Sequence, residues 1–417
     1  MLDNHDHPYM RIKPFMIKKN VKFQEWTNSV YARALFYALL AFLGLRIFTS
    51  LVLLIGVIQP ANVYPTLDIT RNTLFTLEQE SGFSKLFLAP WYRWDTVHYL
   101  EIADFGYDFD PVNTIWPPLY PFLIKTMKLL FQPSLVAGIQ VSNIFFVVGL
   151  FLTYVLTAEI VNEKTARNTL LILVCFPMSF YFIAAYSESL FLVFTAAVFL
   201  LINRKKWLWA GIVSALASLT RVQGVILIIP ILVALIQQYD KDRNLKYLLV
   251  NALSCVYAPF AYGLYSLYVF FGLRADWPWN TLSSYWLQRF SLPWEGFYYT
   301  FLSILGKNIH PDYSPLLVKI LNIILPLFSM YILIAIRKKI PLSYSIYSWI
   351  MLILVVGKID YNNTLVSTAR YLLTIIPVFM GMAIILNHKY LRMAYFSIGI
   401  MLQTILIIFF YWWFWVA

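Results

Sequence analysis

The chain has 417 residues, of which 60% are hydrophobic and 12% are charged, and its formal net charge is +12. A water-soluble fold cannot bury so much apolar surface, so the composition indicates a polytopic membrane protein. The basic residues lie in short clusters between apolar runs, which is typical of cytoplasmic membrane loops, and we expect no nucleic-acid partner.

The N-terminal segment 1–32 is polar and basic up to Lys22, and the first apolar run, 33–58, is too long for the core of a signal peptide. We therefore expect a cytoplasmic N-terminal segment followed by an uncleaved first helix. Arg46 lies midway along this helix, where we expect a structural role with the side chain facing the bundle interior.

The later apolar runs predict an all-α membrane protein with about eleven transmembrane helices, forming a single membrane domain over 1–417. We read 116–131 as an interfacial or re-entrant helix, because counting it as a crossing would export every later basic cluster. Its Lys125 and Lys128 are candidates for holding the phosphates of lipid head groups. The predicted crossings are 33–58, 134–160, 169–186, 187–202, 207–220, 222–238, 247–272, 315–336, 341–357, 370–387 and 391–416.

The first external loop, 59–133, contains the polar stretch WYRWDTVHYLEIADFGY at 91–107. A helix over 94–105, ended by Gly106, puts Asp95, His98, Tyr99 and Ile102 on one face, while Glu101 and Asp104 point elsewhere and are solvated. Asp95, flanked by Arg93 and Trp94, is suited to accept a proton from a sugar hydroxyl. Two alternatives remain open for Asp95: an ion pair with Arg93, or a helix cap. His98 is weaker evidence for a site, because a lone histidine beside aromatic residues is more often a hydrogen-bonded structural residue.

Three further charges lie at membrane depth, where each needs a partner or a polar cavity. They are Glu188 in AAYSES, Arg221 in TRVQG and Arg370 in STARY. Arg221 and Arg370 are shaped to grip the phosphate of a lipid-linked donor, and the alternative is that Glu188 simply neutralises one of them. A Gly-rich phosphate loop, zinc-ligand spacing and a nucleophilic triad pattern are all missing, so we expect no cofactor and no metal.

The polar motifs all fall on the predicted non-cytoplasmic side, where the segments around Asp95, Glu188, Arg221 and 358–371 are expected to converge. The Trp-rich loop 273–313 lies on the same side, with four Trp residues as interface anchors over the outer surface.

The motifs RWDTVHYLEIADFGY, WPPLYPF, CFPMSFYFIAAYSESLF, ALASLTRVQG and STARYLLTIIPVF, in this order, resemble the PIG-V family of mannosyltransferases in the GT-C superfamily. The likeness covers about residues 33–385. It implies a multi-spanning enzyme that takes mannose from a polyprenyl-phosphate donor on the outer face, with Asp95 at the position of the family's catalytic Asp. TRVQG, STARY and WPPLYP depart from the family's usual TRSNG, SMPRY and Phe-Pro-Gly patterns, which affects the identity of the acceptor. The candidate substrate-binding residues are Arg93, Trp94, His98, Glu188, Arg221, Arg370 and Tyr371.

The chemistry that fits is a single displacement with inversion, in which one base suffices. The expected partners are a polyprenyl-phosphate-sugar donor, a lipid or glycan acceptor and membrane lipids. A GT-C transferase of another lipid-linked sugar is the main alternative, and a lipid-linked sugar flippase or transporter is the rival class. The compact loops favour a prokaryotic plasma membrane over an endoplasmic reticulum membrane.

Overall fold

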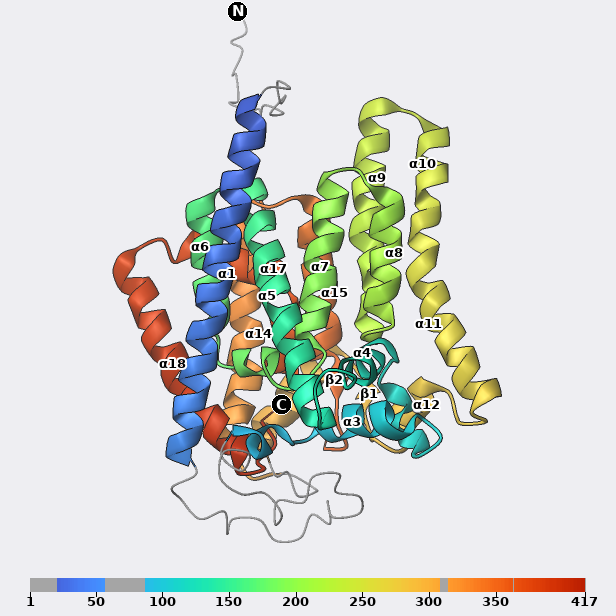
Figure 1. The fold of residues 1–417 in the computed structure, drawn as a ribbon, viewed down its shortest axis with the longest axis vertical. Coiled ribbons are helices and arrows are strands. Elements are labelled where there is room, and N and C mark those ends of the chain that lie inside the picture. Colours follow the sequence, from blue (N-terminus) through green and yellow to red (C-terminus); the bar gives the residue numbers. More distant parts are fainter. Residues whose placement is uncertain (1–20, 57–86, 308–313, 363, 417) are drawn as a thin grey trace, which may run out of the picture.

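The computed structural model describes residues 21–56, 87–307, 314–362 and 364–416. The chain is mostly helical, and the described strands, β1 (Arg289–Phe290) and β2 (Lys358–Ile359), form a short antiparallel pair. Figure 1 shows long helices side by side in a bundle, with short helices gathered at one end. The predicted segments 1–32, 59–133 and 273–313 fall partly on residues 1–20, 57–86 and 308–313, outside the described residues.

The bundle is built from apolar helices that follow the hydrophobic runs of the sequence. The prediction for 134–160 agrees with its helix at both ends. The bundle helices are α1 (Val21–Gly56), α5 (Ser134–Ile160), α6 (Glu163–Val174), α7 (Glu188–Asn203), α8 (Trp207–Ser218), α9 (Ile228–Asp242), α10 (Leu245–Ala252), α11 (Tyr257–Leu267), α14 (Leu316–Ile336), α15 (Leu342–Val356), α17 (Ile376–Ile385) and α18 (Lys389–Tyr411).

Within the described ranges, 6 helices are long and apolar enough to cross a membrane, or up to 7 if one bent pair counts as a span. Helices α7, α8 and α15 are apolar but shorter. The architecture is that of a multi-pass membrane protein, whereas the count of about eleven crossings stays a prediction.

Two predicted crossings are broken by proline. Helix α6 ends at Val174, and an irregular connection, which we call the α6–α7 connection (175–187), leads to α7. Pro177 explains the break, since proline lacks an N–H and disfavours helix in the residue before it. Pro377 follows a second break, where 368–374 and 376–385 meet at 85°. The α6–α7 connection is almost fully buried, as non-helical backbone at membrane depth must be.

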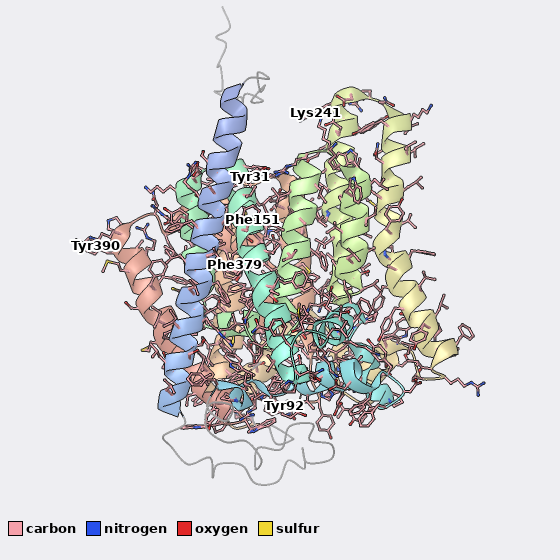
Figure 2. The ribbon with its side chains drawn as sticks, viewed as in Figure 1. Tyr31, Tyr92, Phe151, Lys241, Phe379 and Tyr390 are labelled. Atoms are coloured by element: carbon pink, nitrogen blue, oxygen red, sulfur yellow. The ribbon has the colours of Figure 1, made fainter. Side chains whose placement is uncertain are left out.

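A layer of short elements covers one end of the bundle (Figure 1). Helix α4 has 9 residues, which supports the prediction that 116–131 does not fully cross. Figure 2 places Lys241, in the last turn of α9, at the opposite end of the molecule from Tyr92 of the first loop. The short helices are α3 (Asp95–Phe105), α4 (Leu119–Met127), α12 (Pro278–Ser284), α13 (Pro293–Ile304) and α16 (Thr368–Tyr371), with the 3₁₀ turns η3 (Ala89–Trp91) and η4 (Pro111–Ile115).

Candidate functional site

Helix α3 starts at a strained bend, with Asp95 as its first residue. Trp94, just before it, has φ 52° and ψ −123°, outside the regions that non-glycine residues prefer. Such a conformation costs about 1–3 kcal/mol and persists only where the surrounding structure enforces it. The bend sets the direction in which the Asp95 side chain leaves the backbone.

Residues at the end of α18 support this bend. Arg93 donates hydrogen bonds from Nε and Nη2 to the carbonyl oxygen of Tyr411, at 3.2 and 3.1 Å, and its guanidinium lies 4.3 Å from the ring centre of Trp413. The Trp94 ring meets Trp413 and Trp415 edge-on, with ring centres 5.7 and 4.8 Å apart. Burial lowers the pKa of Arg93 to about 9, so the guanidinium is still charged at neutral pH. These contacts enforce the strained conformation.

The carboxylate of Asp95 pairs with Arg370 of α16 and not with its neighbour Arg93. Its Oδ2 lies 2.9 Å from Nη1 of Arg370. The Asp95 side chain is 15% exposed and that of Arg370 only 3%. Asp95 also sits inside the first turn of α3 and not at the cap position, which Trp94 occupies. Asp95 is therefore neither the ion-pair partner of Arg93 nor a helix cap, which were the two alternatives left open by the sequence.

Glu188, the first residue of α7, joins the two arginines. Its Oε1 lies 2.7 Å from Nη1 of Arg221 and 3.4 Å from Nε of Arg370, and its side chain is 0% exposed. Arg221 also donates to Oγ of Ser187 at 3.3 Å. Glu188 therefore contacts both arginines, whereas the alternative considered from the sequence was that it neutralises only one of them. We call Asp95, Glu188, Arg221 and Arg370 the charge cluster.

The TRVQG turn that carries Arg221 depends on a close backbone approach. Helix α8 ends at Ser218, Arg221 is extended, and a 3₁₀ turn, η6 (Val222–Leu227), follows. A Cβ on Gly224 would overlap the backbone of Ala217 and Ser218, so glycine is required for the turn to pack against α8. This packing fixes the position from which Arg221 reaches the charge cluster.

Three tyrosine rings surround the guanidinium of Arg370, and one of them also lies against that of Arg221. The Arg370 Cζ lies 5.3, 5.4 and 5.2 Å from the ring centres of Tyr181, Tyr186 and Tyr371, and the Arg221 Cζ lies 5.0 Å from that of Tyr371. Tyr181 and Tyr186 come from the α6–α7 connection and are fully buried. Cation–π contacts of this kind strengthen when water is excluded. The rings therefore help to stabilise buried positive charge.

Lys358 of β2 adds a further positive charge at this site. Its Nζ donates to the hydroxyl of Tyr371 at 3.0 Å and lies 4.9 Å from the ring centre. The side chain is half-buried, and among the described residues no carboxylate pairs with it. The two carboxylates and two guanidiniums of the charge cluster cancel, so Lys358 leaves one net positive charge. A site with this balance favours an anion.

A second cluster lies around His98. Its ring stacks on Trp116, with ring centres 4.3 Å apart, and meets the edge of Trp286 at 5.2 Å. Its Nδ1 lies 2.8 Å from Oδ1 of Asn113, whose Nδ2 donates to Glu101 at 3.0 Å. We call these five residues the His98 cluster. The sequence groups His98 with Asp95 on one helical face, but in the structure the two have separate partners.

The expectation that Glu101 and Asp104 are solvated is wrong. Their side chains are only 12% and 9% exposed. Asp104 pairs with Lys128 and accepts a hydrogen bond from Ser134 at 2.6 Å. The reason is that η4, α4 and the start of α5 fold back onto α3, which a helical wheel cannot show. Lys128 is thus engaged within the protein, while Lys125 is exposed and available to a head group.

The Trp-rich loop packs over the first loop, as the sequence suggests. The indole of Trp286 donates to the carbonyl oxygen of Val112 at 3.2 Å, and the strand pair β1–β2 ties the loop to Lys358. Trp279 and Trp294 are exposed and fit the predicted interface anchors.

Sequence reasoning missed several residues of the site. Lys358 is the first residue of the polar segment 358–371, and Tyr186 and Ser187 lie inside AAYSES. These three residues could have been found from the sequence, because they lie within polar segments that had already been identified there. The contact of Trp413 and Trp415 with the bend at Trp94 had no local signal, because it joins the first loop to residues that follow α18.

Comparison with known proteins supports the family resemblance. Residues 116–262 match the family model described as dolichyl-phosphate-mannose-protein mannosyltransferase. GPI mannosyltransferase 2 of Schizosaccharomyces pombe is 28% identical over 159 residues, which cover 37% of this chain and 34% of that protein. The chain therefore matches about a third of the length of this relative. The predicted resemblance to mannosyltransferases is confirmed, and the family segment 116–262 includes Glu188 and Arg221.

Two solved structures of the Archaeoglobus fulgidus oligosaccharyltransferase also overlap with this chain. AglB in complex with an inhibitory peptide and a dolichol-phosphate has a TM-score of 0.40 and 14% identity, covering 89% of this chain and 55% of that chain. The complex with Zn and sulfate has a TM-score of 0.41 and 14% identity, covering 87% and 52%. With TM-scores this low, the likeness carries no argument about the site.

Proposed function

We propose that the protein is a GT-C type glycosyltransferase, because residues 116–262 match a mannosyltransferase family model. It moves mannose from a polyprenyl-phosphate-mannose donor to a lipid-linked or glycan acceptor. Transfer takes place on the non-cytoplasmic side of the membrane. The observation that carries the proposal is the pairing of the partly exposed Asp95 with Arg370, beside a site with one net positive charge.

Asp95 is the better candidate for the base because a substrate can reach it. Its side chain is 15% exposed, whereas that of Glu188 is 0% exposed and lies between two arginines. A general base must come within hydrogen-bond reach of the proton it takes. We therefore assign proton transfer to Asp95 and charge compensation to Glu188.

The reaction we propose is an inverting displacement. The acceptor hydroxyl gives its proton to the Asp95 carboxylate, and its oxygen forms a bond to the anomeric carbon of mannose. The bond from that carbon to the donor phosphate oxygen breaks, and polyprenyl phosphate leaves with the electron pair from the opposite face of the sugar. The proton on Asp95 then passes to solvent, which restores the carboxylate.

We propose that the positive groups beside Asp95 stabilise the leaving phosphate. Arg221 and Arg370 are both tied to carboxylates, which preorganises their guanidinium groups at the cost of part of their charge. Within the described residues Lys358 contacts the hydroxyl and ring of Tyr371 and pairs with no carboxylate, so its charge is available to the donor phosphate. We propose that these three residues share the phosphate, with Tyr371 orienting Lys358.

The His98 cluster is proposed to face the acceptor. The partly exposed ring of His98, on α3, stacks on the buried ring of Trp116 and meets the edge of Trp286. Flat aromatic faces with nearby hydrogen-bond groups suit the apolar faces and hydroxyls of a sugar. Arg93 and Trp94 support Asp95 from behind and are proposed to act through that residue. Exposed Lys125 is proposed to meet lipid head groups of the surrounding membrane, a plasma membrane if the source is prokaryotic.

One experiment tests the activity and the donor sugar together. Purified protein is incubated with polyprenyl-phosphate-linked radiolabelled mannose or glucose and a panel of lipid and glycan acceptors. We expect transfer from the mannose donor, an inverted anomeric configuration in the product, and none with Asp95→Asn. Transfer from the glucose donor alone would favour another sugar, and donor movement across the bilayer without any product would favour a flippase.

A further inference from the structure

Arg46 is a cation in an apolar span, away from the charge cluster. It lies in α1, whose candidate span is Ser29–Leu54. At 1.5 Å per residue, Arg46 sits about 12 Å from Leu54 along the helix, in the half of the span nearer to the α3 layer. A charge at this depth is costly and calls for a partner or a polar cavity.

The contacts of Arg46 within the described protein are weak. Its Nη1 donates to the carbonyl oxygen of Ile183 at a long 3.4 Å, and its guanidinium lies 5.3 Å from the ring centre of Trp91. Among the described residues no carboxylate pairs with it, unlike Arg221 and Arg370. Within the described residues, the positive charge of Arg46 therefore has no negatively charged partner.

Arg46 also lines a cavity of about 480 Å³ between α1, the start of the described first loop and α5. Ser50 and Gln140 contribute polar side chains to its wall, and Val136 and Ile139 contribute apolar ones. Cavities of roughly 300–1,000 Å³ that combine apolar walls with a few polar groups are typical of ligand sites. A guanidinium is well shaped to hold a phosphate through two parallel hydrogen bonds.

We propose that this cavity binds the phosphate group of a membrane lipid. Arg46 supplies the charge, Ser50 and Gln140 supply hydrogen bonds, and the lipid chain runs along Val136 and Ile139. The phosphate belongs either to a glycerophospholipid head group or to a polyprenyl phosphate, because both present the same anion on a long hydrocarbon chain.

This lipid site is distinct from the charge cluster, and the α6–α7 connection lies between them. Ile183 of that connection contacts Arg46, while Ser187 at its end contacts Arg221. The proposal rests on the cavity and the uncompensated charge, and it stands whether or not the protein transfers mannose. A lipid bound here would pack against the same connection that supplies Tyr186 to the charge cluster.

The test measures lipid bound to the full-length protein. Protein is placed in phosphatidylcholine nanodiscs that contain a small fraction of deuterated phosphatidylglycerol or of undecaprenyl phosphate, and the lipid retained after transfer to detergent is quantified by native mass spectrometry. We expect wild-type protein to retain one of the two probes, and Arg46→Gln to bind it about tenfold more weakly through loss of the charged hydrogen bonds. The probe retained identifies the lipid class.

Two further variants make the result decisive. Val136→Phe keeps the charge of Arg46 and fills the cavity at a half-buried position, so it should lose the lipid as well, and it answers the question if Arg46→Gln does not fold. Arg337→Gln removes an exposed arginine at the end of α14 and should change nothing. Equal retention by wild type, Arg46→Gln and Val136→Phe, or retention of phosphatidylcholine alone, would overturn the proposal.

Discussion

The charge cluster and the His98 cluster differ in how the chain assembles them. The charge cluster joins four segments that are far apart in sequence, and three of its side chains are at most 9% exposed. The His98 cluster is mostly local, because four of its residues lie within 98–116 and only Trp286 comes from elsewhere. Its His98 and Trp286 rings are partly exposed, the His98 side chain at 25%, whereas Asn113 and Trp116 are buried.

This contrast indicates that the two clusters beside α3 differ in how strongly they respond to substitution. A buried, paired charge network is rigid, and a change in one member leaves its partner uncompensated. The rings of the His98 cluster interact by stacking and edge contacts, so a change in one of them leaves no buried charge without a partner. We therefore expect large effects from the charge cluster and small effects from the His98 cluster.

The largest expected effect is that of Asp95→Asn. Asparagine keeps the shape but cannot take a proton, so the transfer rate should fall by about a hundred- to ten-thousand-fold. The melting temperature should fall less than in Glu188→Gln, because Asp95 is partly exposed, the asparagine amide oxygen can still accept a hydrogen bond from Arg370, and Glu188 still faces Arg370. Transfer rate and melting temperature are measured on the same purified variant, with exposed Asp108→Asn as the matched control. Near-wild-type turnover would remove Asp95 as the base.

Glu188→Gln should act on stability first. It leaves two buried guanidiniums with Asp95 as their remaining carboxylate, and breaking a buried pair typically costs about 3–5 kcal/mol. Thermal unfolding in detergent measures this loss. Adding Arg221→Gln to Glu188→Gln restores the charge balance and should recover part of the stability. An unchanged melting temperature in Glu188→Gln would mean that the network does not stabilise the fold.

Arg370→Lys and Arg221→Lys should weaken donor binding. Each lysine keeps the charge but loses the planar fork, and a charged hydrogen bond is worth about 1.5–3 kcal/mol, or roughly tenfold or more in affinity. The apparent donor affinity of each variant is compared with that of wild type. If both affinities are unchanged, the two arginines serve only as structural partners of the carboxylates.

Lys358→Met should raise the donor KM several-fold while kcat stays closer to wild type. The donor KM rises because the attraction between the Lys358 ammonium and the donor phosphate is lost. The effect on kcat is smaller because Arg221 and Arg370 remain. Lys358→Arg should restore the donor KM, and Lys125→Met serves as the matched control for loss of a lysine in the external layer. An equal effect of Lys358→Met and Lys125→Met would point to general surface charge.

The smallest effect is expected for His98→Gln. Glutamine can still hydrogen-bond Asn113, and only the stacking on Trp116 is lost, which is worth about 0.5–1.5 kcal/mol. The acceptor KM should rise by a few-fold, with the donor KM unchanged. A loss as large as that of Asp95→Asn would place His98 in the chemistry and end the contrast between the two clusters.

The sequence by itself determined the class of the protein and the course of its helices. The run 134–160 matches its helix at both ends, whereas the predicted crossings 169–186 and 370–387 are broken in the structure, beside Pro177 and Pro377. The motif residues Asp95 and Arg370 were also recognisable, because charges stand out in an apolar chain. These signals are local: hydrophobic length, proline chemistry and isolated charge are all visible within about twenty residues.

Only the tertiary structure decided the partners of these residues. The Asp95–Arg370 pair joins positions 275 residues apart, and no periodicity encodes such a contact. The local sequence predicts that Glu101 and Asp104 are solvated, whereas later segments fold over α3 and cover both side chains. Lys358 became part of the site only through the packing of β2 beside Tyr371. Whether a polar side chain is solvated, paired or poised for chemistry depends on which distant segments surround it, and folding alone brings those segments together.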